Sequence, residues 1–109
     1  MNEPTPVLRL VVSENQSTQS EYDHLNVYLD NQFVGKIRGK LGLRTITIHS
    51  ITIFPEFQAH GYGKLVIEKM QETFNTIVAD RVRFSAIGFW EKMGFTARPD
   101  GSYEYRRKT

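Results

Sequence analysis

The sequence predicts an α/β (α+β) fold, in which a mixed and mostly antiparallel sheet is flanked by helices. Three observations support this prediction. Residues 45–53 form a β-branched run that is typical of a half-buried or central strand, and an apolar stripe of helical period follows it. Short apolar segments joined by turn residues lie before and after this pair. The expected order is four strands, a helix, a strand, a helix and two strands.

The N-terminal residues predict one strand and one loop. Residues 7–12, with the sequence VLRLVV, are expected to form the first strand after a loose tail over residues 1–6. Residues 13–23 are polar and predict a loop, with room for a short turn of helix at most.

A hairpin is expected next. Residues 25–29 and 33–38 contain alternating apolar and polar side chains, and the segment DNQ between them favours a turn. Residues 39–43, GKLGL, contain two glycines and predict the turn that leads into the central strand, which we expect to begin at Arg44.

The central strand leads through a glycine turn into the main helix. Pro55 ends the strand because proline lacks the N–H that a sheet ladder needs. Residues 61–75 are expected to form the helix, with one apolar stripe made by Tyr62, Leu65, Val66, Met70 and Phe74.

A strand and a short helix follow the main helix. Residues 76–82 predict the strand, and residues 86–93 predict the helix. Ser85 is expected to cap the helix, and Gly94 suits the left-handed position after its end. The side chains expected to face inward are Ile87, Phe89 and Trp90.

The chain is expected to finish in a second hairpin. Residues 95–98 and 103–107 are the two strands, and they flank the turn sequence PDG.

Length and composition indicate a single domain over residues 1–109. The chain has no cysteine, which excludes disulfides, thiolate metal sites and a cysteine nucleophile. We expect a cytoplasmic protein that does not bind membranes, because no apolar run approaches the ~20 residues of a membrane span and no signal peptide is predicted. Residues 1–30 carry a net charge of −4 and residues 31–109 a net charge of +6.

The junction between the central strand and the main helix is suited to an anion. Gly61 and Gly63 lack a Cβ, so an anion can approach the backbone N–H groups at the positive end of the helix dipole. His60 and Lys64 add positive charge at the rim. The motif lacks the Gly-Lys-Ser/Thr ending of a P-loop and the spacing G-x-G-x-x-G, which disfavours nucleotide hydrolysis and dinucleotide binding.

Two segments carry a resemblance to a known family. Gln58-x-x-Gly61-x-Gly63, which follows the strand sequence ITIFP and opens a helix, resembles the pyrophosphate loop of the GNAT superfamily of acetyl-CoA-dependent N-acetyltransferases. Residues 86–95, AIGFWEKMGF, are similar to the later helix of that family and to the Gly-Phe that ends it. The two segments occur in the family's order, so the chain resembles a small, single-domain GNAT protein.

The resemblance implies that an acetyl group passes directly from acetyl-CoA, the co-substrate, to a primary amine. In that family the backbone of the loop holds the pyrophosphate, the strand edge before it pairs with the pantetheine amides, and an N–H near Ile53 polarises the thioester carbonyl. Trp90 is either part of the core or a wall against the pantetheine. The expected cofactor-binding residues are Ile51, Thr52, Ile53, Gln58, Ala59, His60, Gly61, Tyr62, Gly63, Lys64 and Trp90.

The resemblance also implies a base and an acid, and the sequence departs from the family at both. Some relatives use a glutamate on the central strand, where the titratable residue here is His49. His49 is either a base, acting directly or through a water, or a strand residue with a satisfied hydrogen bond; Glu56 is a lesser candidate. Many relatives use a tyrosine of the late helix as the acid, where this chain has Trp90, which cannot transfer a proton in that way. Tyr103, Tyr105 or water is expected to substitute.

The acceptor is expected to be a protein lysine, a protein N-terminus or a small amine. Full-size relatives resemble one another in having two helices between the first two strands that grip the acceptor, and this chain has no room for them. The acceptor site is therefore either open and shallow, suited to a protein or peptide, or completed by a second subunit in a homodimer. The second hypothesis is a non-catalytic binding or inhibitory module of this fold, with or without bound CoA.

Metal ions and nucleic acids are not expected as partners. His24, His49 and His60 are too scattered to argue a metal site, and the acidic residues show no paired ligand spacing. The C-terminal segment YEYRRKT combines three consecutive basic residues with two tyrosines, but three charges are few, which favours a solvated strand end.

Overall fold

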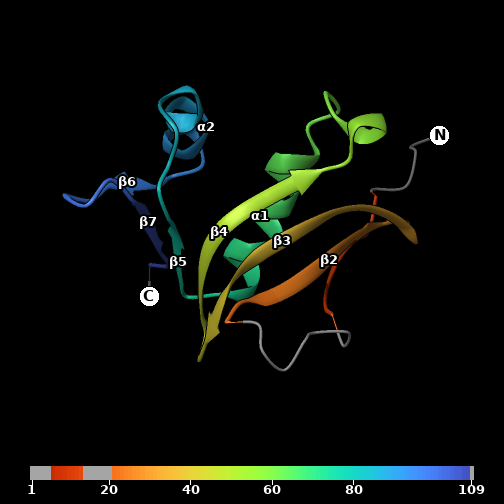
Figure 1. Ribbon diagram of the computed structural model, residues 1–109, viewed down its shortest axis with the longest axis horizontal. Coiled ribbons are helices and arrows are strands. Elements are labelled where there is room, and N and C mark those ends of the chain that lie inside the picture. The colour runs from red at the N-terminus through yellow and green to blue at the C-terminus, as the bar shows by residue number, and fades with distance from the viewer. Residues whose placement is uncertain (1–5, 14–20, 109) are drawn as a thin grey trace.

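The computed structural model describes residues 6–13 and 21–108, so most of the expected loose tail and most of the expected polar loop lie outside the described residues. Seven strands form one sheet in the order β1-β2-β3-β4-β5-β7-β6 (Figure 1). The predicted order of strands and helices is confirmed. The elements are β1 (Leu8–Val12), β2 (Asp23–Leu29), β3 (Gln32–Gly42), β4 (Thr45–Ile53), the 3-10 turn η1 (Pro55–Phe57), α1 (Tyr62–Thr73), β5 (Thr76–Ala79), the 3-10 turn η2 (Phe84–Ala86), α2 (Ile87–Lys92), β6 (Thr96–Ala97) and β7 (Tyr103–Arg106).

The hairpin of β2 and β3 is confirmed, but its second strand is longer than expected. Asp30 and Asn31 form its turn with φ angles of 49° and 73°, which suits the twist of antiparallel strands. The prediction that residues 39–43 form a turn is wrong, because β3 continues through Gly42. An added Cβ at Gly39 would lie 2.2 Å from the carbonyl oxygen of Thr47, so this glycine allows β3 to approach β4 closely rather than to turn.

Strand β4 contains a bulge at His49. The β3 residues Arg38 and Gly39 pair with Ser50 and Ile48, which leaves His49 without a partner in the ladder. The extra residue shifts the alternation of the strand by one position. The isoleucines that face the core are therefore even-numbered before the bulge and odd-numbered after it: Ile46, Ile48, Ile51 and Ile53.

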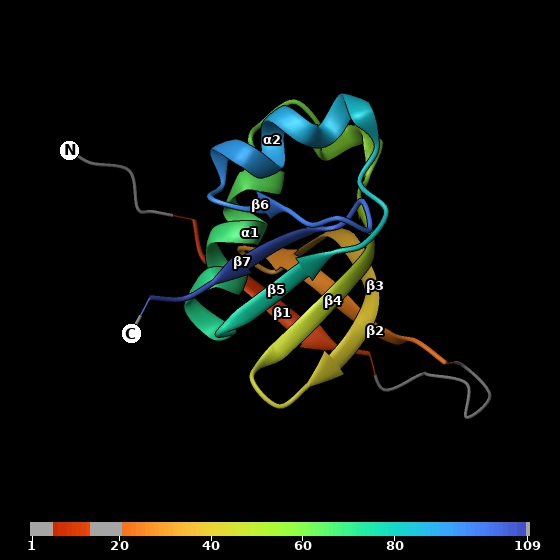
Figure 2. The same cartoon turned by 90° about the vertical axis from the view of Figure 1, so that its left-hand side faces the viewer.

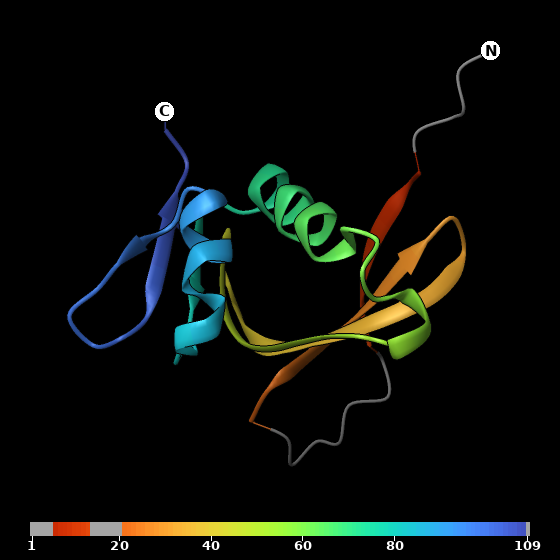
Figure 3. The same cartoon turned by 90° about the horizontal axis from the view of Figure 1, so that it is seen from above.

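Both helices pack on the concave face of the curved sheet (Figure 3), and α2 lies beyond the end of β5 (Figure 2). The predicted stripe of α1 is confirmed at Val66 and Met70, and Ile67 widens it; all three side chains are fully buried. The Nε2 atom of Gln71 donates to the carbonyl of Met93 at 2.6 Å, which ties α1 to the residue after α2. Among the residues placed by the structure, no helix is both long and apolar enough to cross a bilayer.

Details of the C-terminal third differ from the prediction. β5 ends at Ala79, three residues earlier than expected. Ser85 does not cap α2, because it lies within η2 and the start of α2 has no side-chain cap. Phe89 does not face the core, since it is 37% exposed whereas Trp90 is buried. Gly94 has a φ of 88°, as expected for the residue that ends the helix.

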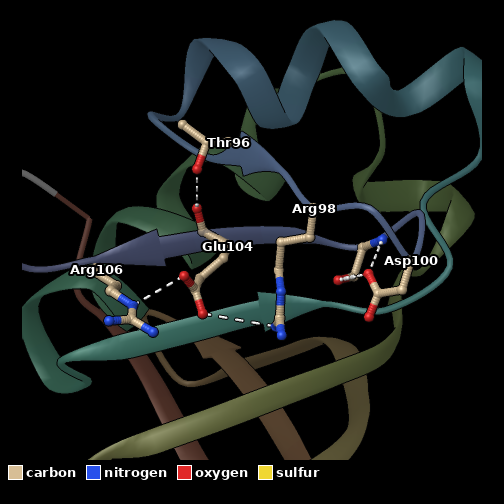
Figure 4. Close-up of polar contacts among 6 residues, drawn as sticks. Thr96, Arg98, Asp100, Glu104 and Arg106 are labelled. Carbon is tan, nitrogen blue, oxygen red and sulfur yellow. Dashed lines mark hydrogen bonds and ion pairs between the residues drawn. The ribbon is translucent and has the colours of Figure 1, made fainter.

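The closing hairpin of β6 and β7 is confirmed, and polar contacts stabilise it (Figure 4). Glu104 accepts a hydrogen bond from Nε of Arg106 at 2.9 Å and lies 3.7 Å from a guanidinium nitrogen of Arg98. In the turn, Asp100 accepts hydrogen bonds from the hydroxyl and the backbone N–H of Ser102, at 2.5 and 2.9 Å. These two bonds, with the hydroxyl bond the larger cause, hold the pKa of Asp100 below its usual value.

Candidate functional site

Strands β4 and β5 pair over the first half of β4 and then separate. Residues 45–48 pair in parallel with residues 76–79, and the N–H of Asp80 donates to the carbonyl of Ile48 at 2.9 Å. Beyond this bond the two strands diverge, since the bulge at His49 bends β4 (Figure 1). In the part of the chain that the structure describes, residues 50–53 therefore have no ladder partner on the β5 side.

A cleft of about 410 Å³ lies where the strands separate. It is lined by residues 48–52 of β4, by residues 79–83 at and after the end of β5, by Ala86 at the end of η2 and by Trp90. The indole of Trp90 is 8% exposed and packs edge-to-face on Phe95, with 4.9 Å between ring centroids. Three residues expected to contact a cofactor, Ile51, Thr52 and Trp90, are thus brought to one cleft.

The loop between β4 and α1 presents backbone N–H groups. Ala59 and Gly61 adopt left-handed φ angles of 65° and 77°, which turn the chain sharply into the helix. Within the described residues, the N–H groups of residues 59–64 have no backbone acceptor, and the ladder of α1 begins when the N–H of Leu65 donates to Gly61 at 3.3 Å. Nε2 of Gln58 donates to the carbonyl of Ile53 at 2.8 Å and fixes the loop to the end of β4.

The space beside this loop is open and apolar on one side. A cavity of about 320 Å³ is lined by the loop, Ile53, the first residues of α1 and Phe89. An added Cβ at Gly61 would meet no atom within 4 Å, and one at Gly63 would only reach the ring of Phe89 at 4.0 Å. Free N–H groups at a helix N-terminus, with no acidic residue in its first turn, are suited to a phosphate or pyrophosphate group.

The polar side chains of the loop differ in their positions. Lys64 lines the cavity, whereas the exposed ring of His60 stacks on Tyr62 with centroids 5.5 Å apart. His60 is not among the residues that line the cavity.

His49 is paired with a carboxylate that the sequence analysis did not identify. Its Nδ1 lies 3.0 Å from Oδ2 of Asp80, and the two side chains are 26% and 36% exposed. The ring also contacts Tyr22 edge-on, with centroids 5.0 Å apart. When Nδ1–H donates to the carboxylate, Nε2 is the ring atom that can accept a proton. Sequence reasoning missed Asp80 because residues 76–82 were expected to form one strand, whereas β5 ends at Ala79 and leaves Asp80 beside the bulge of its parallel neighbour.

The structure does not bring Tyr103 to the cleft. Tyr103 lies on β7 opposite Ala79, is 7% exposed and belongs to the core. Tyr105 is half-buried against Phe95, with ring centroids 5.7 Å apart. Glu56 is exposed in η1 and lines neither cavity. Of the candidate catalytic residues, His49 is the one that lines the cleft.

The described residues include no group of three or more histidine or carboxylate side chains that could hold a metal ion.

Comparison with known proteins extends these findings. The model of the acetyltransferase (GNAT) family matches residues 2–95. The uncharacterized protein YyaT of Bacillus subtilis is 27% identical over 86 residues, which cover 75% of this chain and 58% of that protein. An uncharacterized N-acetyltransferase of Oceanobacillus iheyensis is 32% identical over 50 residues, which cover 46% of this chain and 31% of that protein.

A similar fold is found among solved structures. A Bacillus subtilis acetyltransferase crystallised in complex with CoA matches with a TM-score of 0.62 at 13% identity, over 94% of this chain and 100% of that chain. The two curated relatives are longer, since the chain spans 58% and 31% of their lengths.

Proposed function

This chain belongs to the GNAT family of acetyltransferases, and we propose that it transfers the acetyl group of acetyl-CoA to a primary amine of an acceptor. One observation carries the proposal. The separation of β4 from β5 leaves a strand edge and a cleft directly beside a loop of free N–H groups, an arrangement that suits an extended thioester with a charged end.

The backbone does most of the binding in this proposal. N–H groups of residues 59–64 hold the pyrophosphate, with Lys64 adding charge, and the unpaired edge of Ile51, Thr52 and Ile53 bonds the pantetheine amides. Gln58 keeps the loop in place through its bond to Ile53. Trp90 forms the wall of the cleft against the pantetheine. The binding of CoA by the structural neighbour is consistent with these assignments.

His49 acts as the base. The acceptor amine must lose its proton before its lone pair can attack the thioester carbonyl, and the bulge presents the imidazole at the cleft where that attack would occur. Asp80 is a positioning residue that holds Nδ1 and leaves Nε2 for the amine proton. The C–N bond forms as the C–S bond breaks, and the electron pair of the C–S bond leaves with the sulfur.

Water, rather than a tyrosine, protonates the departing thiolate in this proposal. Tyr103 is buried on β7, so it could act as the acid only if the hairpin moved. A thiolate is a tolerable leaving group, and the absence of an acid lowers the rate more than it blocks the reaction.

The burial of Tyr103 and the presence of Trp90 at the position of the family's tyrosine also favour a second candidate, a non-catalytic binding module that keeps CoA as a ligand. The two candidates differ in turnover and share the cofactor site.

An acetyl-transfer assay separates them. Purified protein is incubated with acetyl-CoA and a panel of lysine peptides, N-terminal peptides and small amines, and both free thiol and acetylated product are measured. Product formation that depends on His49 supports the enzyme; binding of acetyl-CoA without product from any acceptor supports the module. The control is His24→Ala, which removes a histidine that lies outside the cleft.

A further inference from the structure

The convex face of the sheet lies opposite α1 (Figure 3). Strands β1 and β3 contribute four exposed cations to this face. Arg9, Lys36, Arg38 and Lys40 alternate with buried residues of β1 and β3, so their side chains leave the sheet on the side away from the core. The one acidic residue within β1–β4, Asp23, accepts a hydrogen bond from the N–H of Leu41 at 2.7 Å. Among the described residues, both helices pack on the other face of the sheet, and β1–β4 carry four Lys or Arg side chains against one acidic side chain.

Aromatic rings position these cations. Three cations lie over rings of the same face: Arg9 over Tyr28 at 5.2 Å, Lys36 over Phe33 at 5.9 Å and Arg38 over Tyr22 at 5.0 Å. A ring that is covered by a cation is not free to stack on a nucleobase. Nη2 of Arg9 donates to Oδ1 of Asn31 at 3.2 Å and Nζ of Lys40 donates to the carbonyl of Glu21 at 2.9 Å, so it is the further N–H donors of these cations that a carboxylate can use. The face therefore suits carboxylates better than nucleic acid.

The basic face leads to the pair of His49 and Asp80. A cavity of about 190 Å³ is lined by Tyr22, Arg38, His49, Asp80 and Arg81. Arg38 and Tyr22 belong to the basic face, and His49 and Asp80 also line the larger cleft between β4 and β5. A chain that lies on the basic face can thus present an amine to His49 from the side opposite the thioester.

We propose that the acceptor is an acidic polypeptide. Its carboxylates bind Arg9, Lys36, Arg38 and Lys40, and an amine next to them enters the cavity at His49. Guanidinium groups form two parallel hydrogen bonds with a carboxylate, and the rings beneath them keep them in place for it. The inference rests on the proposed function for the transfer step but not for the docking of the peptide.

Peptide binding tests the docking surface without any transfer. Two fluorescent peptides carry one lysine, flanked by glutamates in one and by glutamines in the other. The variant Lys36→Glu/Lys40→Glu is compared with Lys92→Glu/Lys108→Glu, which makes the same change of net charge at exposed positions outside the face. The glutamate peptide is expected to bind wild type best, to weaken by at least about tenfold in the first variant alone, and to weaken as salt increases.

Three results would overturn the inference. These results are equal binding of the two peptides, equal affinities of the two double variants for the glutamate peptide, or tighter binding of a single-stranded oligonucleotide than of the glutamate peptide. Circular dichroism of both variants excludes unfolding as the cause.

Acetylation of the same peptides separates this inference from the proposed function. A higher kcat/KM for the glutamate peptide, lost in Lys36→Glu/Lys40→Glu, supports both. Equal acetylation of both peptides keeps the function and overturns the acidic acceptor. Selective binding of the glutamate peptide without acetylation of any amine keeps the docking surface and overturns the function.

Discussion

The Nδ1 atom of His49 lies 3.0 Å from Oδ2 of Asp80, across the point where β4 and β5 part. The first residue is the bulge of one strand and the second directly follows the end of the other. Two backbone features, the bulge and the early end of β5, thus bring together an imidazole and a carboxylate that are 31 residues apart in the chain. The same features open the cleft, so the site and its proposed base have one structural origin.

The first prediction concerns this pair. His49→Ala should lower kcat by about a hundredfold or more, because it removes the proposed base, and should leave the Kd for acetyl-CoA unchanged. Asp80→Asn should lower kcat by a smaller factor, because the imidazole stays but is no longer held by a carboxylate. Steady-state kinetics with calorimetry measure both. Added imidazole should restore part of the activity of His49→Ala and none of the activity lost in Asp80→Asn; wild-type kcat in either variant contradicts the assignment.

The second prediction concerns Gln58. Gln58→Ala removes the bond to the carbonyl of Ile53, so the loop should lose order and the Kd for acetyl-CoA should rise several-fold. Gln58→Glu should act in the same direction, because a carboxylate cannot donate to that carbonyl. Calorimetric titration measures the effect, and Gln32→Ala, an exposed glutamine at the start of β3, is the control. Equal affinities in all four proteins would show that the bond has no role in binding.

The third prediction concerns the core beneath α1. Met70 is fully buried, so Met70→Ala should lower the free energy of unfolding by about 2–5 kcal/mol. Glu68→Ala, on the exposed side of the same helix, should change it by less than about 0.5 kcal/mol. Urea denaturation measures both values. Similar midpoints for the two variants would place Met70 outside the core.

The fourth prediction concerns pH and Asp100. The pKa of this carboxyl is lowered in the folded protein by its bonds to Ser102, so its contribution to stability is present above the unfolded value of 3.8 and is lost as the pH falls through the lower folded value. Asp100→Asn should therefore unfold at lower urea than wild type at pH 7, and this difference should shrink at pH 3. Ser102→Ala should behave in the same way. A difference that grows on acidification would contradict the cause given for the shift.

Much of the fold was predictable because local patterns carry it. The isoleucine and threonine run ended by a proline, the helical stripe through Val66 and Met70, and the turn residues of both hairpins all agree with the observed elements. The glycines of residues 39–43 led to the wrong prediction of a turn, because glycine occurs both in turns and where two strands approach closely. At Gly39 the close neighbour is the backbone of β4.

The turn before α1, which is the proposed cofactor site, was also predictable in part as a structure, since its glycines and the helix after it form a local motif. The pair of His49 and Asp80 was not, because it depends on which strands lie side by side. The sequence does contain one sign of the bulge, namely that the isoleucines change from even to odd positions around His49. Prediction of the basic face also requires the sheet register, since this face combines residues of β1, β2 and β3.

The central claim is that the loop at Gly61 binds acetyl-CoA, and calorimetric titration of wild type, Gly61→Asn and Gly61→Asp tests it most directly. Both substitutions adopt the positive φ of 77° at similar cost, but only aspartate places a negative charge where the pyrophosphate would lie. We predict binding in the micromolar range for wild type, weaker binding for Gly61→Asn and none for Gly61→Asp, with all three folded. Wild type that is folded and does not bind, or Gly61→Asp that binds as wild type does, would contradict the account.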